Sequence, residues 1–264
     1  MAKIQEGDFV LLSASQKKKW MIKIEPEKQF HTHRGTIDLE SLIGLEFGSQ
    51  IKSSKGANFF LWKPLPSDYQ DAIQHSTQVI YNTDAAQIIL SAGACNGSKI
   101  IEAGTGSGGL TVLLAKYVSP DGRIYSYDRS ESHQVIAQKN LKKLGLEDQV
   151  EFKVRDVTEG FDEKEIEAII LDLPVPWEVI PSARESLMGG GVLIVFVPTY
   201  VQVEQTIAQM KDYHFFQIEA FEIIRRDLTT RIGAIRPVTR MIGFTGFLIT
   251  GRKGLVNNPS KENE

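Results

Sequence analysis

The stretch Glu102-Ala-Gly-Thr-Gly-Ser-Gly-Gly109 decides how this chain folds, because it joins a strand pattern to a helical one. Residues 99–101 before it have strand character, and residues 110–117 after it carry apolar side chains at helical spacing. Glycines permit a sharp turn and let a ligand approach the backbone, and the amino end of a helix attracts electronegative groups. The stretch therefore predicts a strand-to-helix turn that cradles a nucleoside cofactor.

Two cofactor classes fit these glycines equally well. The spacing G-x-G-x-x-G at Gly104, Gly106 and Gly109 is the dinucleotide fingerprint, whereas class I methyltransferases use G-x-G-x-G, here Gly104, Gly106 and Gly108, for S-adenosylmethionine. A tight turn without a ligand is the third interpretation, and four glycines in six residues count against it. An NAD-dependent dehydrogenase therefore remains open at this point.

Outward from the glycine stretch, strands and helices alternate. We expect strands at 123–128, 150–154, 168–171 and 192–197, helices at 110–117, 131–144 and 201–211, and two closing strands at 215–224 and 241–250. Continuous apolar strands separated by helices predict an α/β domain with a parallel sheet covered on both faces. We place this Rossmann-like domain at residues 65–253, followed by a flexible tail at 254–264.

The first part of the chain has a different texture. Residues 9–13, 20–24 and 58–62 (FVLLS, WMIKI and NFFLW) have strand length and β-favouring side chains, and they predict a small β domain over residues 1–64. Two prolines within residues 63–67 indicate a linker. Residues 67–92 then have helical spacing, interrupted at Tyr81-Asn-Thr-Asp84, where Thr83 or Asp84 is expected to cap a helix over 85–92.

Composition narrows the class of protein. The 264 residues include 30 Lys and Arg against 33 Asp and Glu, so a nucleic-acid partner would need a local basic patch. Cys95 is the only cysteine, which excludes an intrachain disulfide and a cysteine-rich zinc site, and we expect it to be a small buried residue. The sequence lacks a signal-peptide pattern and a membrane-length apolar run, so we expect a soluble, cytoplasmic protein with no membrane contact.

Single carboxylates follow three of the predicted strands. Asp128 ends the second and could accept both ribose hydroxyls of either cofactor. Asp156 follows the third, where it could accept from an adenine amino group or cap the next helical turn. Asp172 follows the fourth, in Leu171-Asp-Leu-Pro-Val-Pro-Trp177, at the edge of the sheet where ligands of open α/β folds bind.

The loop after the fourth strand favours methyl transfer over hydride transfer. Its acid, two prolines and Trp177 resemble the acid-Pro-Pro-aromatic loop of amino-methyltransferases that act on nucleic-acid bases. Trp177 could stack on a base there, and it could equally be a core aromatic of the following helix.

Together the motifs resemble the tRNA (adenine-N1)-methyltransferases that modify adenine 58 of the T-loop, in their homotetrameric bacterial and archaeal form. The motifs are spread over nearly the whole chain in the family's order: His31-Thr-His-Arg-Gly-Thr-Ile37 with Ile43-Gly44, Gln78-Val-Ile-Tyr81 with Asp84-Ala85, Glu102-Ala-Gly-Thr-Gly-Ser-Gly-Gly-Leu-Thr111, Leu171-Asp-Leu-Pro-Val-Pro-Trp177, Arg236-Pro237 and Thr245-Gly246.

The resemblance implies S-adenosylmethionine as cofactor, tRNA as substrate, a homotetramer of two-domain subunits and no metal. It implies catalysis by Asp172 with Tyr81 beside the target base, and tRNA contacts from Tyr81, Trp177, Arg225 and Arg236. The implied cofactor-binding residues are Gln78, Glu102, Gly104, Thr105, Gly106, Ser107, Gly108, Leu110, Thr111, Asp128, Arg129, Asp156 and Asp172.

The chain departs from the family pattern at three points. Asn82-Thr83 replaces the usual Pro-Lys after Tyr81, and Asp128 replaces a glutamate. Phe244 stands where the family has histidine before Thr-Gly, so no role is carried over for that histidine.

Basic residues supply candidate phosphate contacts. Lys17-Lys-Lys19 is more simply a solvated charge run, whereas Arg225, Arg226, Arg231, Arg236 and Arg240 are expected at the mouth of the site. His31, His33 and Arg34 look like a metal cluster, but we favour turn structure or RNA contact over zinc.

Alternatives to the adenine-58 enzyme are the dehydrogenase, a methyltransferase of the same fold acting on another base or another substrate, and a non-catalytic RNA-binding subunit. The dehydrogenase leaves the Asp172–Trp177 loop unexplained. A non-catalytic subunit should lack the glycines or the acid, and this chain has both.

Overall fold

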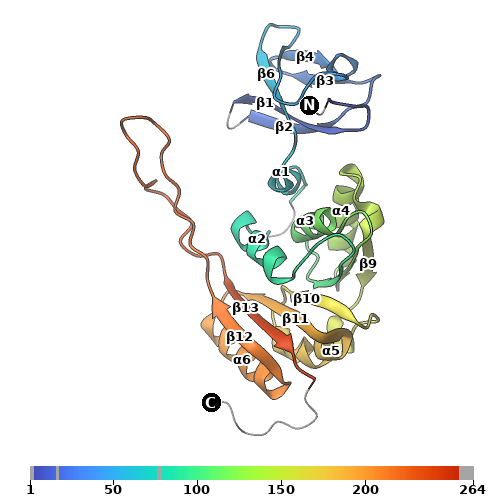
Figure 1. The fold of residues 1–264 in the computed structure, drawn as a ribbon, viewed down its shortest axis with the longest axis vertical. Helices are drawn as coiled ribbons and strands as arrows, with labels where there is room; N and C mark the ends of the chain where they lie inside the picture. Colours follow the sequence, from blue (N-terminus) through green and yellow to red (C-terminus); the bar gives the residue numbers. More distant parts are fainter. Residues whose placement is uncertain (1–2, 16–17, 76–78, 256–264) are drawn as a thin grey trace. The chain divides into compact units, whose positions relative to one another are not determined.

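The computed structural model describes residues 3–15, 18–75 and 79–255 and divides the chain into two compact units, residues 1–73 and 74–264 (Figure 1). The first unit is a small β domain with one four-stranded sheet in the order β2-β1-β6-β5 and one hairpin, β3-β4. Its elements are β1 (Phe9–Ser15), β2 (Lys18–Lys23), β3 (Gln29–Thr32), β4 (Gly35–Asp38), η1 (Glu40–Leu42), β5 (Gln50–Lys52), β6 (Asn58–Trp62) and α1 (Pro66–Asp71).

The core of the first unit forms because its strands alternate buried and exposed side chains. In β6, Phe59 and Leu61 are fully buried while the residues between and beside them face outward. Helix α1 belongs to this unit, since Lys19 of β2 bonds to Asp68 at 2.9 Å and to Asp71 at 3.1 Å. The division between the units therefore falls after residue 73, beyond the expected boundary at residue 64.

The two histidines of the first unit, His31 and His33, lie in the β3-β4 hairpin. His31 pairs with Thr36 across the hairpin, with 3.3 Å between its Nδ1 and the Thr36 Oγ1, and His33 lies in the connecting turn. Among the residues that the structure describes, no group of three or more His, Cys, Asp or Glu side chains is placed to hold a metal ion.

The second unit is built on a seven-stranded sheet in the order β12-β13-β11-β10-β7-β8-β9. Its strands are β7 (Lys99–Ala103), β8 (Arg123–Asp128), β9 (Val150–Val154), β10 (Ile166–Leu171), β11 (Leu187–Val197), β12 (Phe215–Phe221) and β13 (Phe247–Lys253). Its helices are α2 (Asn82–Ser91), α3 (Gly109–Val118), α4 (Glu131–Lys143), η2 (Glu147–Gln149), η3 (Val157–Glu159), η4 (Pro176–Val179), α5 (Ile180–Ser186) and α6 (Tyr200–Asp212).

Strand order places a topological switch point between β7 and β10. The five strands β7 to β11 pair in parallel, and β13 runs antiparallel to both β11 and β12. From β7 the chain moves outward through β8 to β9 and then crosses back to β10 on the other side of β7. Loops that leave neighbouring strands in opposite directions open a crevice at their carboxyl ends.

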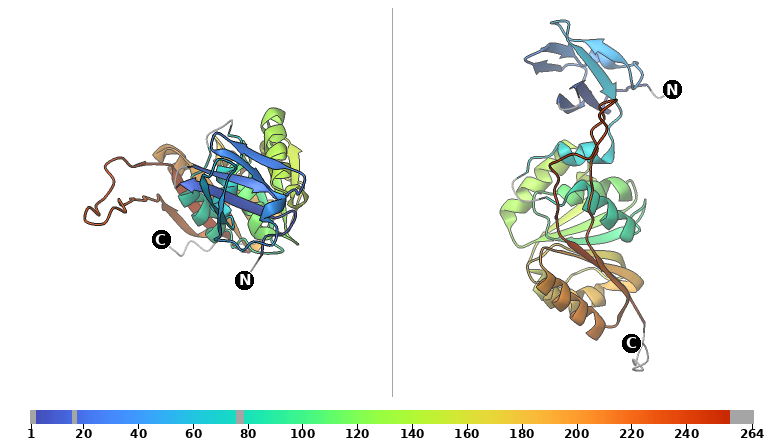
Figure 2. Two further views of the ribbon diagram at one scale, coloured as in Figure 1. Left: turned by 90° about the horizontal axis from the view of Figure 1, so that it is seen from above. Right: turned by 90° about the vertical axis from the view of Figure 1, so that its left-hand side faces the viewer.

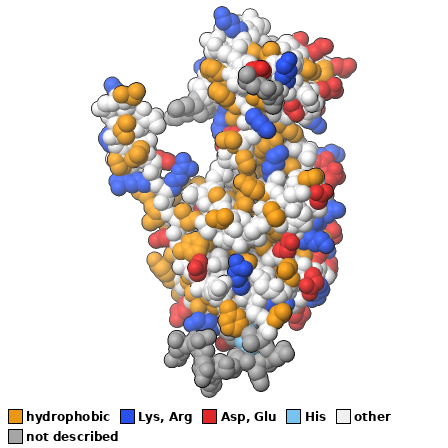
Figure 3. Space-filling view, in the orientation of Figure 1, with side chains coloured by type: hydrophobic (Ala, Val, Ile, Leu, Met, Phe, Trp, Pro, Cys, Tyr) orange, Lys and Arg blue, Asp and Glu red, His pale blue; other side chains and the backbone are white. Residues whose placement is uncertain are grey.

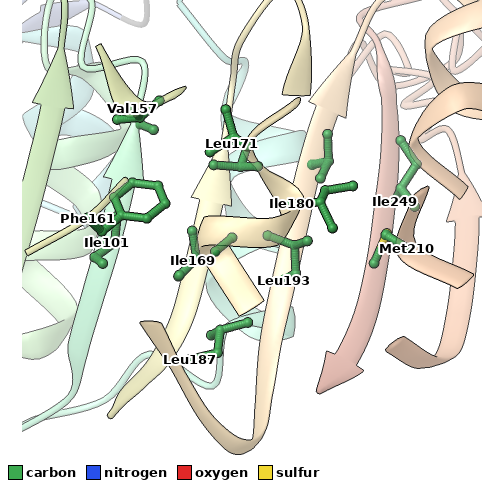
Figure 4. Close-up of a cluster of buried hydrophobic side chains, with 14 of the residues drawn as sticks. Ile101, Val157, Phe161, Ile169, Leu171, Ile180, Leu187, Leu193, Met210 and Ile249 are labelled. Carbon is green, nitrogen blue, oxygen red and sulfur yellow. The ribbon is translucent and has the colours of Figure 1, made fainter. Parts of the chain in front are cut away.

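Helices cover both faces of this sheet, as the apolar strands predict. Helices α5 and α6 pack on one face, where Ile180 and Met210 meet Leu193 and Ile249 of the strands (Figure 4). Helices α2, α3 and α4 pack side by side on the other face. No helix among the described residues is both long and apolar enough to cross a membrane.

A long arm separates the last two strands. We call residues 222–246 the arm; it leaves the sheet between β12 and β13 and extends away from the second unit (Figures 1 and 2). The expected strands at 215–224 and 241–250 are therefore wrong at these ends. Ile224 and Ile242 have strand-forming side chains, but both are exposed on the arm instead of paired in the sheet.

Two local expectations also fail. Helix α2 begins at Asn82 with Tyr81 as its N-cap, and neither Thr83 nor Asp84 caps it. Asp84 is instead buried in the first turn, where desolvation raises the pKa of its carboxyl. Cys95 is exposed rather than buried, because it lies in the turn between α2 and β7, with its Sγ 3.4 Å from the Ser98 Oγ.

We predict that Leu193→Ala lowers the free energy of unfolding of the chain by about 2–5 kcal/mol, because it opens a cavity at a fully buried site in the central sheet. The exposed Val201→Ala should change it by less than about 0.5 kcal/mol. Denaturant unfolding followed by circular dichroism measures both, and equal effects of the two substitutions would contradict this description of the core.

Candidate active site

A cavity of about 610 Å³ opens at the carboxyl ends of β7, β8, β9 and β10. It is lined by the glycine turn after β7, by the residues that end β8 and β9, and by the loop after β10. Its place at the topological switch point is the place where open α/β sheets bind ligands.

Two backbone segments that line the cavity, at Gly104 and at Asp172, approach each other closely. Gly104 has φ of +101°, and a Cβ atom there would lie 2.3 Å from the carbonyl oxygen of Asp172. The Asp172 amide donates to the Ala103 carbonyl at 2.9 Å, which extends the β7-β10 pairing by one residue. Only glycine fits between these strands, so the residue that begins the turn also sets the position of the acid that follows β10.

Glu102 is a buried carboxylate beneath the same turn. It is 2% exposed and accepts hydrogen bonds from the Thr111 hydroxyl at 2.6 Å and the Ser126 hydroxyl at 2.7 Å. Burial raises the pKa of Glu102 to about 7, the two hydroxyls oppose this, and the charges of Asp172 and Asp128 add to it. The cavity is therefore a region of negative potential.

Asp128 ends β8 and holds the glycine turn that follows the neighbouring strand β7. One carboxylate oxygen accepts from the Gly106 amide at 3.0 Å, and the other accepts from the Ser130 amide at 2.8 Å. The His133 Nδ1 lies 3.3 Å from the first of these oxygens. Asp128 thus holds the glycine turn and presents its carboxylate along the wall of the cavity.

Asp156 caps the next helical turn, which is one of the two interpretations that its sequence position allows. It caps η3 by accepting from the Thr158 amide at 3.0 Å and the Thr158 hydroxyl at 2.7 Å, and these bonds lower the pKa of its carboxyl. It also lines the cavity, beside Arg129 and Arg155.

Asp172 stands at the mouth of the cavity. The residue as a whole is exposed, but the surrounding protein desolvates its carboxyl and raises its pKa to about 6. The loop that follows is fixed where the Gln202 side-chain amide of α6 donates to the Pro174 carbonyl at 2.9 Å. Trp177 does not line the cavity; it is half-buried against the apolar core of the α5-α6 face, as the second interpretation of that residue has it.

The structure brings most of the predicted cofactor residues together. Those that line the cavity are Glu102, Gly104, Thr105, Gly106, Ser107, Leu110, Asp128, Arg129, Asp156 and Asp172. Gly108 and Thr111 are not among the lining residues: Gly108 packs against α4, and the Thr111 hydroxyl donates to Glu102. Gln78 lies outside the described residues.

The predicted tRNA-contacting residues lie farther out. Tyr81 directly follows the cavity-lining Ile80 and is 42% exposed. Arg225 and Arg236 lie on the arm, where Arg225 pairs with Asp227 at 2.9 Å. Lys19 is bound to the acids of α1, and Lys17 lies outside the described residues.

Sequence reasoning missed His133, Ser126 and Glu178. His133 and Glu178 line the cavity, and Ser126 supports Glu102 from β8. His133 could have been found, since the first turn of a helix that follows a parallel strand lies at the same sheet edge as the strand's end. Ser126 could not, because a serine within a strand carries no signal of the partner across the sheet.

Comparison with known proteins identifies the family. The family described as tRNA methyltransferase complex GCD14 subunit matches residues 58–242, which is more than half of the chain. The chain belongs to this tRNA methyltransferase family. A second family, described as TrmI-like N-terminal, matches residues 3–51 and so covers most of the first unit.

Individual relatives of this methyltransferase chain agree with the family assignment. It is 32% identical over 270 residues to a tRNA (adenine(57)-N(1)/adenine(58)-N(1))-methyltransferase TrmI of Methanocaldococcus jannaschii, covering 92% of this chain and 94% of the relative. Its structure matches a SAM-dependent O-methyltransferase from Thermotoga maritima with a TM-score of 0.83, 33% identity and 97% coverage of both chains. It also matches the tRNA (m1A58) methyltransferase TrmI from Aquifex aeolicus with a TM-score of 0.76 and 28% identity, over 96% of this chain and 99% of that chain. The predicted α/β methyltransferase fold is confirmed.

The raised pKa of Glu102 predicts how stability changes with pH. Because the native carboxyl holds its proton up to about pH 7 and the unfolded one only to its usual range near 4.5, the native state binds more protons in between. The free energy of unfolding should therefore fall as pH rises from about 4.5 to 7.

Glu102→Gln should reduce this fall, because the amide keeps an oxygen acceptor for Thr111 or Ser126 and carries no charge. The exposed Glu147→Gln on η2 is the control and should leave the slope unchanged. Denaturant titrations at several pH values measure the slope, and an unchanged slope in Glu102→Gln would show that this burial does not govern it.

Proposed function

We propose that this chain transfers the methyl group of S-adenosylmethionine to N1 of adenine 58 in the T-loop of tRNA, with adenine 57 as the second candidate target. The proposal combines the acid-lined cavity at the switch point with the relatives named for this reaction. The observation that carries it is the position of Asp172, the acid at the mouth of that cavity, against the glycine turn.

The charge of the cavity supports S-adenosylmethionine over a dinucleotide. Five acids line it, namely Glu102, Asp128, Asp156, Asp172 and Glu178, against two arginines, Arg129 and Arg155. The pyrophosphate of NAD would add two negative charges to this site. The sulfonium and ammonium groups of S-adenosylmethionine are cations, and they would offset the desolvation of Glu102 and the repulsion from Asp172 and Asp128 that together raise its pKa.

The residues present fit this cofactor. The absence of a Cβ at Gly104 leaves the turn open to a close ligand, and the buried carboxyl of Glu102 lies beneath the turn, where a cationic amino-acid end would favour its ionised form. Asp128 would receive the ribose hydroxyls and Asp156 the adenine amino group. S-adenosylmethionine, when bound, supplies a sulfonium methyl group that a ring nitrogen can attack without further activation.

Asp172 is the residue that acts on the target base. Adenine N1 is paired within folded tRNA, so the base has to be extruded into the site before its N1 can react. Methylation at N1 leaves the base cationic until a proton departs from N6. The Asp172 carboxylate would stabilise that charge and could accept the N6 proton, which its pKa of about 6 permits at neutral pH.

The charge of the arm favours a large anionic substrate. It carries five arginines against two acids, and Figure 3 shows its basic side chains among apolar ones. Arginines that contact phosphates give affinity without sequence information. The apolar residues of the arm are also suited to contacts between copies of the chain. The homotetramer remains a prediction, which sedimentation velocity tests, and the cytoplasmic location remains a prediction as well.

The reaction itself is tested with an unmodified tRNA transcript and labelled S-adenosylmethionine, followed by nucleoside analysis. The proposal expects label in 1-methyladenosine, and it expects loss of most label in a transcript with adenine 58 replaced by guanine. Label in any other nucleoside, or none at all, would contradict it.

Asp172→Asn should retain S-adenosylhomocysteine binding and lower the single-turnover rate of methylation by about 10²-fold or more. In the wild type this rate should rise with pH through about 6 and then level, because the carboxylate is the active form. The exposed Glu204→Gln on α6 should behave as wild type. A wild-type rate in Asp172→Asn would remove Asp172 from the chemistry.

Gly104→Ala should abolish measurable binding of S-adenosylhomocysteine, because its Cβ cannot lie 2.3 Å from the Asp172 carbonyl and the turn has to move. The matched control is Gly190→Ala, which also has a positive φ, +78°, but has no atom within 4 Å of its Cβ. Calorimetric titration measures both, and intact binding in Gly104→Ala would count against this cradle.

A further inference from the structure

Three aromatic rings gather where β11 ends and β13 begins. Tyr200 begins α6, Phe244 lies near the end of the arm and Phe247 begins β13. The ring of Phe247 is 4.6 Å from that of Tyr200 and 4.9 Å from that of Phe244, measured between centroids. Phe247 is buried, but Tyr200 is 76% exposed and Phe244 45% exposed, so the buried ring supports two rings that face solvent.

Strand register places this cluster at the same sheet edge as Asp172. Leu171 of β10 pairs with Val195 of β11, and two residues farther along Val197 pairs with Phe247. Strand β13 is two strands from β10, so at ~4.8 Å per strand the backbone of Phe247 lies about 10 Å across the sheet from the end of β10, which Asp172 follows. The start of α6 is also tied to the active-site loop, because Gln202 donates to the carbonyl of the cavity-lining Pro174.

Base extrusion creates a need for such rings. When one base leaves its stack, its neighbours lose a stacking partner, and a protein aromatic ring can take that place. Trp177, which the sequence offered for stacking on a base in the active-site loop, packs on the core instead. Tyr200 and Phe244 are exposed aromatic rings supported by a third ring at the same edge.

We infer that Tyr200 and Phe244 form a base-stacking site for a nucleotide of the tRNA that is next to or near the extruded adenine. This inference rests on the proposed function and adds a site to it. Charge favours a nucleic acid as the occupant over a second copy of this acidic chain. The arm that carries Phe244 has five arginines against two acids, and Arg240 lies four residues before Phe244.

The test uses the full chain, an unmodified tRNA transcript and the variants Tyr200→Leu, Phe244→Leu and their combination. Leucine keeps apolar bulk but lacks a π face, so each single variant should raise the KM for tRNA by about 5-fold or more, and the double variant by more still. The kcat and the affinity for S-adenosylhomocysteine should stay within about 2-fold. Tyr200→Phe should restore the wild-type KM, because stacking needs the ring and not the hydroxyl.

Tyr213→Leu is the matched control, since Tyr213 is an exposed tyrosine at the opposite end of α6. Thermal melting checks that each variant folds, and sedimentation velocity checks its assembly. If wild-type protein methylates adenine 58 and the leucine variants keep the wild-type KM, the stacking site is wrong while the proposed function stands. A change in assembly with unchanged KM would assign the rings to a contact between copies and also overturn the inference. Absence of adenine-58 methylation in the wild type would remove the proposed function itself.

Discussion

The contact between Gly104 and the backbone of Asp172 is the constraint on which the site depends. Strands β7 and β10 are parallel neighbours in the sheet. The hydrogen bond from the Asp172 amide to the Ala103 carbonyl continues their pairing beyond the end of β10. A side chain at residue 104 would push the two loops apart. One piece of sheet geometry therefore positions both the proposed cofactor cradle and the proposed catalytic acid, and neither can move without the other.

Electrostatics add a second constraint. Glu102, Asp128 and Asp172 line one cavity, and desolvation keeps the pKa values of Glu102 and Asp172 well above their usual range, with the charges of Asp172 and Asp128 adding to the rise at Glu102. This arrangement costs stability in the unliganded protein at neutral pH and favours a cationic ligand. A site that binds a sulfonium ion and generates a cationic base gains from the same negative potential at both stages.

The sequence predicted the parts of the fold that repeat a regular pattern. The strand at 150–154 was predicted at its observed bounds and α3 within one residue at each end, because continuous apolar strands and helical spacing are local signals. The short strands β3 and β5 and helix α5 lack such a signal. The expected strands extend into the two ends of the arm because isoleucines there have strand propensity, and propensity does not report whether a partner strand is present.

The sequence predicts those parts of the candidate site that lie directly at the ends of parallel strands. Gly104, Asp128 and Asp172 are at strand ends that share one sheet edge, so their convergence follows from topology. Trp177 shows the limit of this reasoning, because its position in the motif did not determine which way the ring points. Tyr200 and Phe244 come together only through the pairing of β11 with β13, and no spacing within the chain reports that pairing.

The most direct test of the central claim is amide hydrogen exchange of the full chain with and without S-adenosylhomocysteine. If the switch-point cavity is the cofactor site, binding should slow exchange in the glycine turn at residues 104–110 and at the ends of β8 and β9, with little change in the β domain of residues 1–73. Binding that protects another region and leaves the glycine turn unchanged would contradict the account.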